Sequence, residues 1–94
     1  MPRCGTIRVV KRSHLRTLEA IFARPTSGNI RWDDIESLLL ALGADIEERE
    51  GSRVAIIFPD HPPAIFHRPH PSPMTDKGAV AVMRRWLEFL GYKP

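Results

Sequence analysis

The chain has 94 residues, of which 43% are hydrophobic and 27% charged, the composition of one small globular domain. This length excludes a barrel enzyme or any two-domain enzyme. No stretch approaches the roughly 18 apolar residues of a membrane span, and the basic N-terminus has no apolar signal-peptide segment. We therefore expect a cytoplasmic protein. The single cysteine, Cys4, excludes an intrachain disulfide and a cysteine-based zinc site.

The net charge of +3 is unevenly distributed along the chain. Residues 1–31 carry seven basic and one acidic residue, residues 32–51 one basic and seven acidic, and residues 52–94 six basic and three acidic. A fold can gather these blocks into one positive and one negative face. A positive face suits a polyanion such as nucleic acid, and ordinary solvated surface charge is the alternative.

The first part of the chain is predicted to be a tail followed by one helix. Residues 1–12 are rich in basic residues and contain at most a short strand around residues 7–10. A helix is predicted over residues 13–23, and it ends there because the residue before Pro25 avoids the helical conformation. Its apolar stripe comprises Leu15, Leu18, Ile21 and Phe22. We therefore divide the chain into a tail with an accessory helix (residues 1–27) and a main domain (residues 28–94).

A second helix is predicted over residues 32–42. Asp33 and Asp34 lie in its first turn, where carboxylates interact favourably with the helix dipole. Gly43 follows the last residue of this helix, and a glycine at that position commonly ends a helix. Its apolar face comprises Ile35, Leu38, Leu39 and Leu42.

Three short strands follow, over residues 44–50, 53–58 and 64–67 or 68. Gly51 and Ser52 form the first turn, and a proline-rich segment at residues 59–63 forms the second. The middle strand alternates, with Val54, Ile56 and Phe58 on one face. Because turns this short join only antiparallel neighbours, the strands are predicted to form an antiparallel meander. Pro69, Pro71 and Pro73 close the third strand.

The last helix is predicted from residue 75 or 76 to residue 90, with Gly91 as its stop. Its predicted core stripe comprises Val80, Met83, Leu87 and Leu90, widened by Ala79, Val82, Trp86 and Phe89. Its predicted solvent side comprises Ala81, Arg84, Arg85 and Glu88. The sum is an α+β fold, in which a three-stranded antiparallel sheet has helices packed on one face. The order α-β-β-β-α is that of double-stranded-RNA-binding domains, with an extra N-terminal helix.

Three of the four histidines, His61, His67 and His70, fall within ten residues. One interpretation is a metal site, although Asp60 and Asp76 are the only further ligands nearby. A second is that they are ordinary surface residues beside a positive patch. A third is acid–base chemistry, since histidine titrates near neutrality. RNA supplies its own nucleophile, the 2′-hydroxyl, so its cleavage needs a base, an acid and a cation but no metal.

Several short motifs occur in a recognisable order between residues 29 and 91. They are Leu42-Gly43, Gly51-Ser52, Phe58, Pro69-His70 and Lys77-Gly78. Their order and spacing resemble the HicA-type toxin family of bacterial toxin–antitoxin systems. The resemblance implies a double-stranded-RNA-binding-like fold and a metal-independent, cofactor-free endoribonuclease acting on messenger RNA. It also implies neutralisation by a HicB-like antitoxin protein in the bacterial cytoplasm.

The chain departs from the family's pattern at Arg53, which stands where members carry the catalytic histidine after Gly-Ser. Arginine keeps its proton and cannot act as a general base. It can still bind a phosphate or stabilise a pentacoordinate phosphorane. The predicted catalytic residues are therefore His67, His70 and Arg53. The predicted RNA-binding residues are Ser52, Arg53, Arg68, Lys77, Arg84 and Arg85.

Three hypotheses follow from these residues. In the first, Arg53 binds phosphate while His67 or His70 transfers protons, and the chain cleaves RNA. In the second, the chain binds RNA without cleaving it. In the third, it is a protein-interaction module whose basic face binds an acidic partner. Trp32 and Trp86 are predicted to pack in or beside the core rather than to stack on bases.

Overall fold

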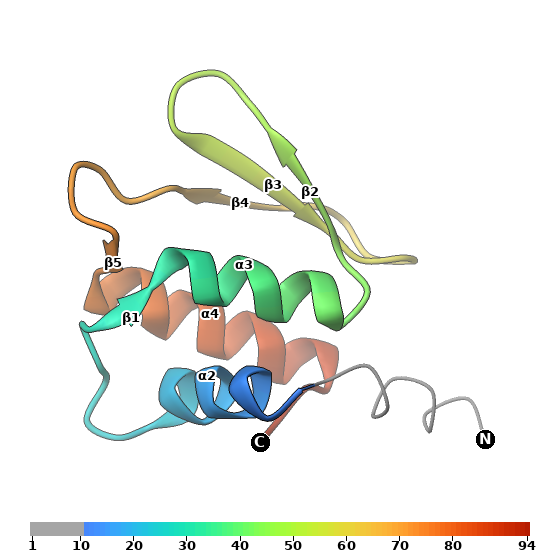
Figure 1. Ribbon diagram of the computed structural model, residues 1–94. Coiled ribbons are helices and arrows are strands. Elements are labelled where there is room, and N and C mark those ends of the chain that lie inside the picture. Colours follow the sequence, from blue (N-terminus) through green and yellow to red (C-terminus); the bar gives the residue numbers. More distant parts are fainter. Residues whose placement is uncertain (1–10) are drawn as a thin grey trace.

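Three helices and a three-stranded sheet form three layers in the computed structural model, which describes residues 11–94: the sheet, two helices beneath it, and the N-terminal helix beneath those two (Figure 1). The elements are α2 (Arg12–Phe22), β1 (Ile30–Arg31), α3 (Trp32–Ala41), β2 (Asp45–Glu48), β3 (Arg53–Ile57), β4 (Ala64–His67), β5 (Met74–Thr75) and α4 (Lys77–Leu90). The α+β class and the extra N-terminal helix are thus confirmed. Cys4 and the strand predicted around residues 7–10 lie outside the described residues.

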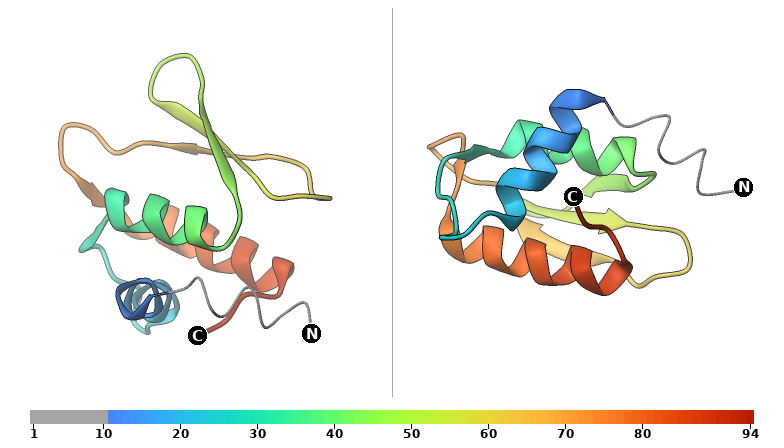
Figure 2. Two further views of the ribbon diagram at one scale, coloured as in Figure 1. Left: turned by 45° about the vertical axis from the view of Figure 1, so that its right-hand side comes forward. Right: turned by 90° about the horizontal axis from the view of Figure 1, so that it is seen from below.

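The main sheet is an antiparallel meander in the order β2-β3-β4, as the short turns predicted. Because side chains alternate along a strand, each face carries every second residue. Val54, Ile56 and Phe66 are buried on one face, and they belong to the same core as the helices. In the described part of the chain, all helices lie on this side of the sheet (Figures 1 and 2).

A second, two-stranded sheet was not predicted from the sequence. Ile30 pairs with Thr75, and Arg31 pairs with Met74. The Trp32 backbone N–H also donates a hydrogen bond to the Pro73 carbonyl oxygen, at 2.9 Å. Since α3 directly follows β1 and α4 follows β5 after one residue, this pairing fixes the N-terminal ends of the two helices relative to each other.

The ends of the helices follow the local signals in the sequence. Asp76 caps α4 by accepting a hydrogen bond from the Ala79 N–H at 3.3 Å. Gly91 ends that helix with a φ of 96°, and Gly43 follows the end of α3 with a φ of 106°. These left-handed conformations favour glycine, because other residues are strained there.

The core includes the accessory helix. α2 packs against both α3 and α4, and its residues Leu18 and Ile21 are buried (Figure 2). Leu15 was predicted for the same stripe, but this prediction is wrong, because 46% of the residue is exposed. The core comprises Leu18, Ile21, Ile30, Trp32, Ile35, Leu38, Leu39, Ala44, Val54, Ile56, Phe58, Phe66, Val80, Met83 and Leu87.

The position of α2 also changes which side of α4 is buried. Arg84, predicted to face solvent, is only 8% exposed and donates hydrogen bonds at 3.5 Å to the carbonyl oxygens of Ile21 and Ala23. Val82 and Phe89, predicted for the core, are 47% and 79% exposed. The sequence prediction was wrong at these three positions because α2 covers the side of α4 that carries Arg84.

Candidate functional site

The face of the sheet opposite the helices brings the predicted site residues of two strands together. Arg53 on β3 is paired directly with His67 on β4, and Ala55 is paired with Ile65. Because directly opposite residues of antiparallel strands point to the same face, the side chains of Arg53 and His67 are neighbours. Both residues are exposed, so a ligand can reach them.

Arg53 has hydrogen-bonding capacity left for a ligand. Its Nε donates to the Glu50 carbonyl oxygen at 3.4 Å, and none of the ion pairs found within residues 11–94 involves it. With Arg49, Glu50 and Ile65 it lines a surface hollow of about 320 Å³. A guanidinium with free N–H groups beside a hollow can bind an anion in bidentate fashion.

The segment after β4 is joined to the β2–β3 turn. The Arg68 backbone N–H donates to the Ser52 carbonyl oxygen at 2.7 Å. Ser52, Arg53, His67 and Arg68 therefore meet at one end of the sheet. His70 follows on the exposed segment toward β5. His70 is only two residues beyond Arg68, and two residues of chain span at most about 7 Å. The His70 backbone therefore stays close to this end of the sheet.

The Arg68 side chain binds carboxylates of the protein itself. Its two terminal nitrogens lie 2.8 Å from Glu36 Oε2 on α3 and 3.2 Å from Glu48 Oε2 on β2. Glu36 Oε2 also accepts a hydrogen bond from Trp32 Nε1 at 2.6 Å. The hydrogen bond to Glu36, supplemented by Glu48, raises the pKa of Arg68 above the usual arginine value although burial opposes it. Arg68 thus fixes the end of β4 against the helix layer.

The other predicted RNA-binding residues lie in the helix layer. Lys77 begins α4, and its side chain runs beside Gly28, where an added Cβ atom would lie 3.3 Å from Lys77 Cγ. Arg84 is buried beneath α2, and Arg85 is exposed. The structure therefore does not bring these three residues to the cluster of Arg53 and His67.

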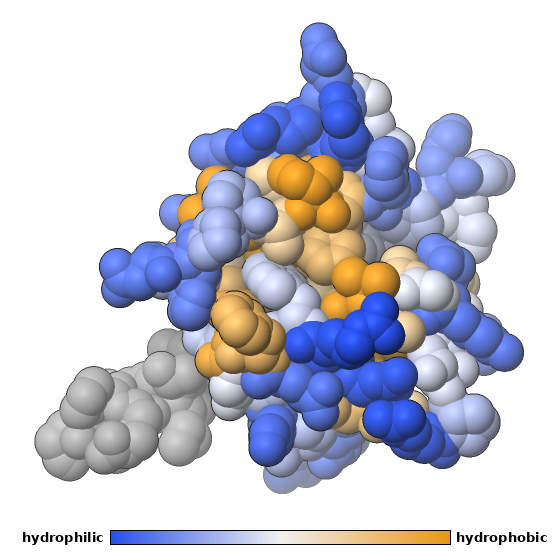
Figure 3. Space-filling model, turned by 180° about the vertical axis from the view of Figure 1, so that it is seen from behind, coloured by the Kyte–Doolittle hydropathy of each residue, from blue (hydrophilic) through white to orange (hydrophobic). Residues whose placement is uncertain are grey.

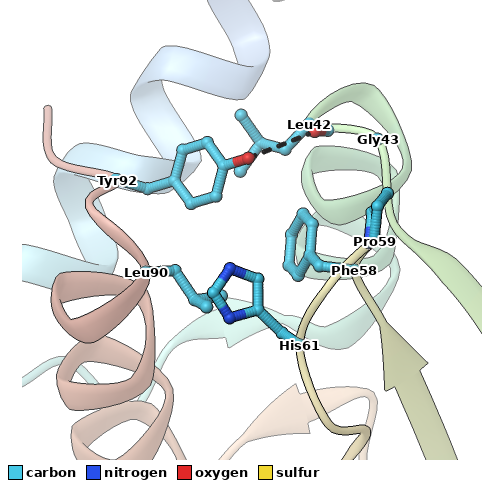
Figure 4. Close-up of a pocket in the computed structure, with 7 residues that line it drawn as sticks. All are labelled: Leu42, Gly43, Phe58, Pro59, His61, Leu90 and Tyr92. Atoms are coloured by element: carbon cyan, nitrogen blue, oxygen red, sulfur yellow. Dashed lines mark hydrogen bonds between the residues drawn. The ribbon is translucent and has the colours of Figure 1, made fainter.

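The remaining histidines of the described chain lie elsewhere. His61 precedes β4 and lines a hollow of about 260 Å³ with Phe58, Leu90 and Tyr92 (Figure 4). The complete lining comprises Leu42, Gly43, Phe58, Pro59, His61, Leu90 and Tyr92. His61 and His67 thus lie at opposite ends of β4. Within residues 11–94, no three side chains of the His, Cys, Asp and Glu types are placed to hold one metal ion.

His14 connects α2 to α3. Its Nδ1 accepts a hydrogen bond from the Lys11 N–H at 3.1 Å, and its Nε2 lies 2.9 Å from Ser37 Oγ. Because Nδ1 is the acceptor, the neutral ring carries its proton on Nε2 and donates to Ser37. The ring is therefore not oriented to take a proton from Ser37, and the pair links two helices.

Comparison with known proteins identifies the family of the chain. The model described as HicA toxin of bacterial toxin-antitoxin matches residues 32–92, from the start of α3 to just beyond α4. No curated protein and no solved structure matches. The chain belongs to the HicA toxin family and is a toxin of a toxin–antitoxin system, so its partner is of the antitoxin kind. In residues 11–94, no helix combines the length and the apolar character needed to cross a membrane.

Proposed function

We propose that this toxin binds messenger RNA and cleaves it as a metal-independent endoribonuclease, and that a HicB-like antitoxin neutralises it. The observation that carries the proposal is the direct pairing of Arg53 with His67 on the open face of the sheet. It places a permanent cation beside an imidazole, a group that can transfer protons, and RNA cleavage uses both kinds of group.

The chemistry uses the 2′-hydroxyl of the RNA as nucleophile. A base removes the proton of this hydroxyl, and the oxygen attacks the adjacent phosphorus. The bond to the 5′-oxygen breaks, and an acid protonates that oxygen as it leaves, which gives a 2′,3′-cyclic phosphate. We assign the two proton transfers to His67 and His70. Arg53 binds the phosphate and stabilises the negative charge that develops on it.

The charges of the sheet favour one path for the RNA. Asp45 and Glu47 on β2 share the open face with Arg53 and His67, because Glu47 pairs with Ala55. Carboxylates repel phosphates, so we place the RNA along β3 and β4 and away from β2. The Ser52 hydroxyl at the turn can donate to a phosphate oxygen.

The remaining basic residues take different places in the proposal. Lys77 at the start of α4 is a secondary phosphate contact for a longer RNA. Arg68 and Arg84 are left out, since their guanidinium groups bind the protein's own oxygens. Apart from the two-residue strand β5, the elements from α3 to α4 follow the order α-β-β-β-α of double-stranded-RNA-binding domains, which supports an RNA ligand.

The second candidate function is RNA binding without cleavage. It is favoured by Arg53, which replaces the histidine that follows Gly-Ser in the family pattern and cannot act as a base. In this case the cluster binds phosphate but lacks one proton-transfer group.

One experiment separates the two functions. Purified chain is incubated with a messenger-RNA transcript in excess EDTA, and the products and their termini are analysed. We expect fragments ending in 2′,3′-cyclic phosphate, a loss of about 10²-fold or more in rate for His67→Ala, and no change for the control His61→Ala. Intact RNA together with salt-sensitive binding would establish the second function instead.

A further inference from the structure

The hollow beside Arg53 combines charged groups with one apolar side chain. Its lining comprises Arg49, Glu50, Arg53 and Ile65. Ile65 lies on β4 and shares the open face with Arg53, because it pairs with Ala55. Ile65 is 50% exposed. Seen from behind, hydrophilic side chains stand at the top of the molecule, where the β2–β3 turn lies, and apolar side chains are exposed directly below them (Figure 3). A ligand in this hollow therefore meets an apolar surface as well as charges.

The β2–β3 turn brings Glu50 beside Arg53. The Arg49 N–H donates to the Arg53 carbonyl oxygen at 2.9 Å, which closes the turn around Glu50. Gly51 follows with a φ of 68°, a left-handed conformation that favours glycine. Arg53 Nε donates to the Glu50 carbonyl oxygen at 3.4 Å, so the Arg53 side chain lies back against the turn. A phosphate bound to this guanidinium is therefore next to Glu50.

Among the residues that line this hollow, Glu50 carries the negative charge. Arg49 Nη2 lies 3.3 Å from Glu47 Oε1, so Arg49 already has a carboxylate partner. In the described part of the chain, Glu50 forms no ion pair. A second phosphate in the hollow would be repelled by Glu50. A neutral ligand with N–H donors and a flat apolar face suits both Glu50 and Ile65.

A nucleobase of single-stranded RNA has these properties. The hollow has a volume of about 320 Å³, near the lower end of the roughly 300–1,000 Å³ of ligand pockets, so it accommodates one small ring system. Proteins that recognise single-stranded RNA bind the ring face of a base by stacking and read its Watson–Crick edge by hydrogen bonds. Ile65 offers an apolar surface to the ring face, and Glu50 offers acceptors to the edge.

The carboxylate of Glu50 favours guanine among the four bases. A carboxylate only accepts hydrogen bonds, and it has two oxygens to do so. Guanine presents two donors side by side, N1–H and the N2 amino group, which match both oxygens. Adenine and cytosine present one amino group beside a ring nitrogen that is itself an acceptor. The single ring N–H of uracil lies between two carbonyl oxygens, which a carboxylate repels.

We propose that this hollow binds a guanine base next to the phosphate on Arg53, with the ring face on Ile65 and the Watson–Crick edge on the Glu50 carboxylate. The inference rests on the proposed function, because it requires RNA on the open face of the sheet. It specifies the substrate as RNA with an unpaired guanine beside the bound phosphate, since the Watson–Crick edge of a base in a duplex is already paired.

The test measures binding separately from cleavage. The purified full chain is titrated with labelled 2′-O-methylated uridine oligomers, which lack the nucleophile and carry guanine, adenine, cytosine, uracil or no base at the central position. We expect the guanine oligomer to bind about tenfold more tightly than the other three base-containing oligomers. Glu50→Gln replaces one acceptor by a donor and should abolish this preference. The matched control Glu88→Gln, which removes an exposed carboxylate from α4, should retain it.

A second variant tests the apolar part of the hollow. Ile65→Thr keeps a β-branched residue in β4 and removes apolar surface. We expect it to weaken binding of the guanine oligomer about fivefold and to leave binding of the oligomer without a central base unchanged. Circular dichroism verifies that each variant is folded.

The outcomes separate the base site from the proposed function. Equal binding of the four base-containing oligomers, or a guanine preference that survives Glu50→Gln, would overturn the base site and leave RNA binding intact. A preference for adenine or cytosine would overturn the assignment to guanine. If Ile65→Thr weakened binding of the oligomer without a central base as strongly as that of the guanine oligomer, Ile65 would not contact the base. Failure of the wild-type chain to bind any oligomer would overturn the proposed function as well.

Discussion

Arg53 and His67 lie directly opposite each other on β3 and β4 and share the face of the sheet that no helix of residues 11–94 covers. Arg53 stands where the family pattern has a histidine, and the pairing sets it beside another histidine, His67, 14 residues further along the chain. It also provides the most direct test of whether Arg53 limits catalysis.

The variant Arg53→His restores the residue that follows Gly-Ser in the family pattern. If cleavage lacks an efficient base, we expect this variant to cleave RNA faster than wild type at neutral pH. A histidine acts as a base only when it is neutral, so the rate of RNA cleavage by this variant should rise as pH increases through about 6.5. The measurement is the rate of RNA cleavage between about pH 5 and 8. A slower variant with the wild-type pH profile would show that Arg53 is itself required.

The neighbouring residues Arg84 and Arg85 should differ sharply in their effect on stability. Arg84→Ala removes a buried side chain and leaves the carbonyl oxygens of Ile21 and Ala23 without their donor. We expect it to lower the free energy of unfolding by about 1–3 kcal/mol. Arg85→Ala changes an exposed residue and should stay within about 0.5 kcal/mol of wild type. Urea denaturation measures both, and equal effects would contradict the structural role of Arg84.

The accessory helix should be required for a stable core, although it lies outside the residues that match the family. Ile21 is fully buried, so Ile21→Ala is expected to lower the free energy of unfolding by about 2–4 kcal/mol. Leu15→Ala, on the exposed side of the same helix, serves as the control and should cost less than about 0.5 kcal/mol. If thermal or urea denaturation found no difference between them, α2 would not belong to the core in solution.

The two carboxylates around Arg68 should contribute unequally. The Glu36 side chain is 22% exposed and also binds Trp32, whereas the Glu48 side chain is 75% exposed. We expect Glu36→Gln to lower the free energy of unfolding by about 1–2 kcal/mol and Glu48→Gln to lower it by less than about 0.5 kcal/mol. Because the pKa of Arg68 is raised on folding, its contribution is present below the usual arginine pKa and is lost only as pH rises above it. Urea denaturation at neutral pH measures the two variants with Arg68 fully charged.

The sequence predicted the elements whose signals are local. The second and last helices end where Gly43 and Gly91 indicated, and the short turns were sufficient to predict the antiparallel meander. The closeness of Arg53 and His67 follows from that meander. By contrast, the β1–β5 pairing joins residues more than forty positions apart, and two-residue strands leave no periodic pattern to detect.

The errors on α4 have a single physical origin. The periodicity of the helix identifies Val80, Met83 and Leu87 as one buried line, but the buried arc can extend to either side of it. α2 covers the side with Arg84, so Val82 and Phe89 remain in solvent. Similarly, the sequence could not show that the guanidinium of Arg68, a predicted RNA-binding residue, is bound by Glu36 and Glu48, because these carboxylates come from distant elements. Such contacts depend on tertiary packing, which no pattern within one segment contains.

The stretch that carries His70 is tethered at both ends. On one side the Arg68 N–H binds the Ser52 carbonyl oxygen, and on the other Met74 pairs with Arg31. Only five residues bridge these two attachments, so the imidazole of His70 sweeps a small volume beside the hairpin turn. In the proposed function, an RNA strand would therefore have to adapt its own backbone to this bridge, and local flexibility of the transcript, rather than a moving loop of the protein, would govern which phosphates are reached.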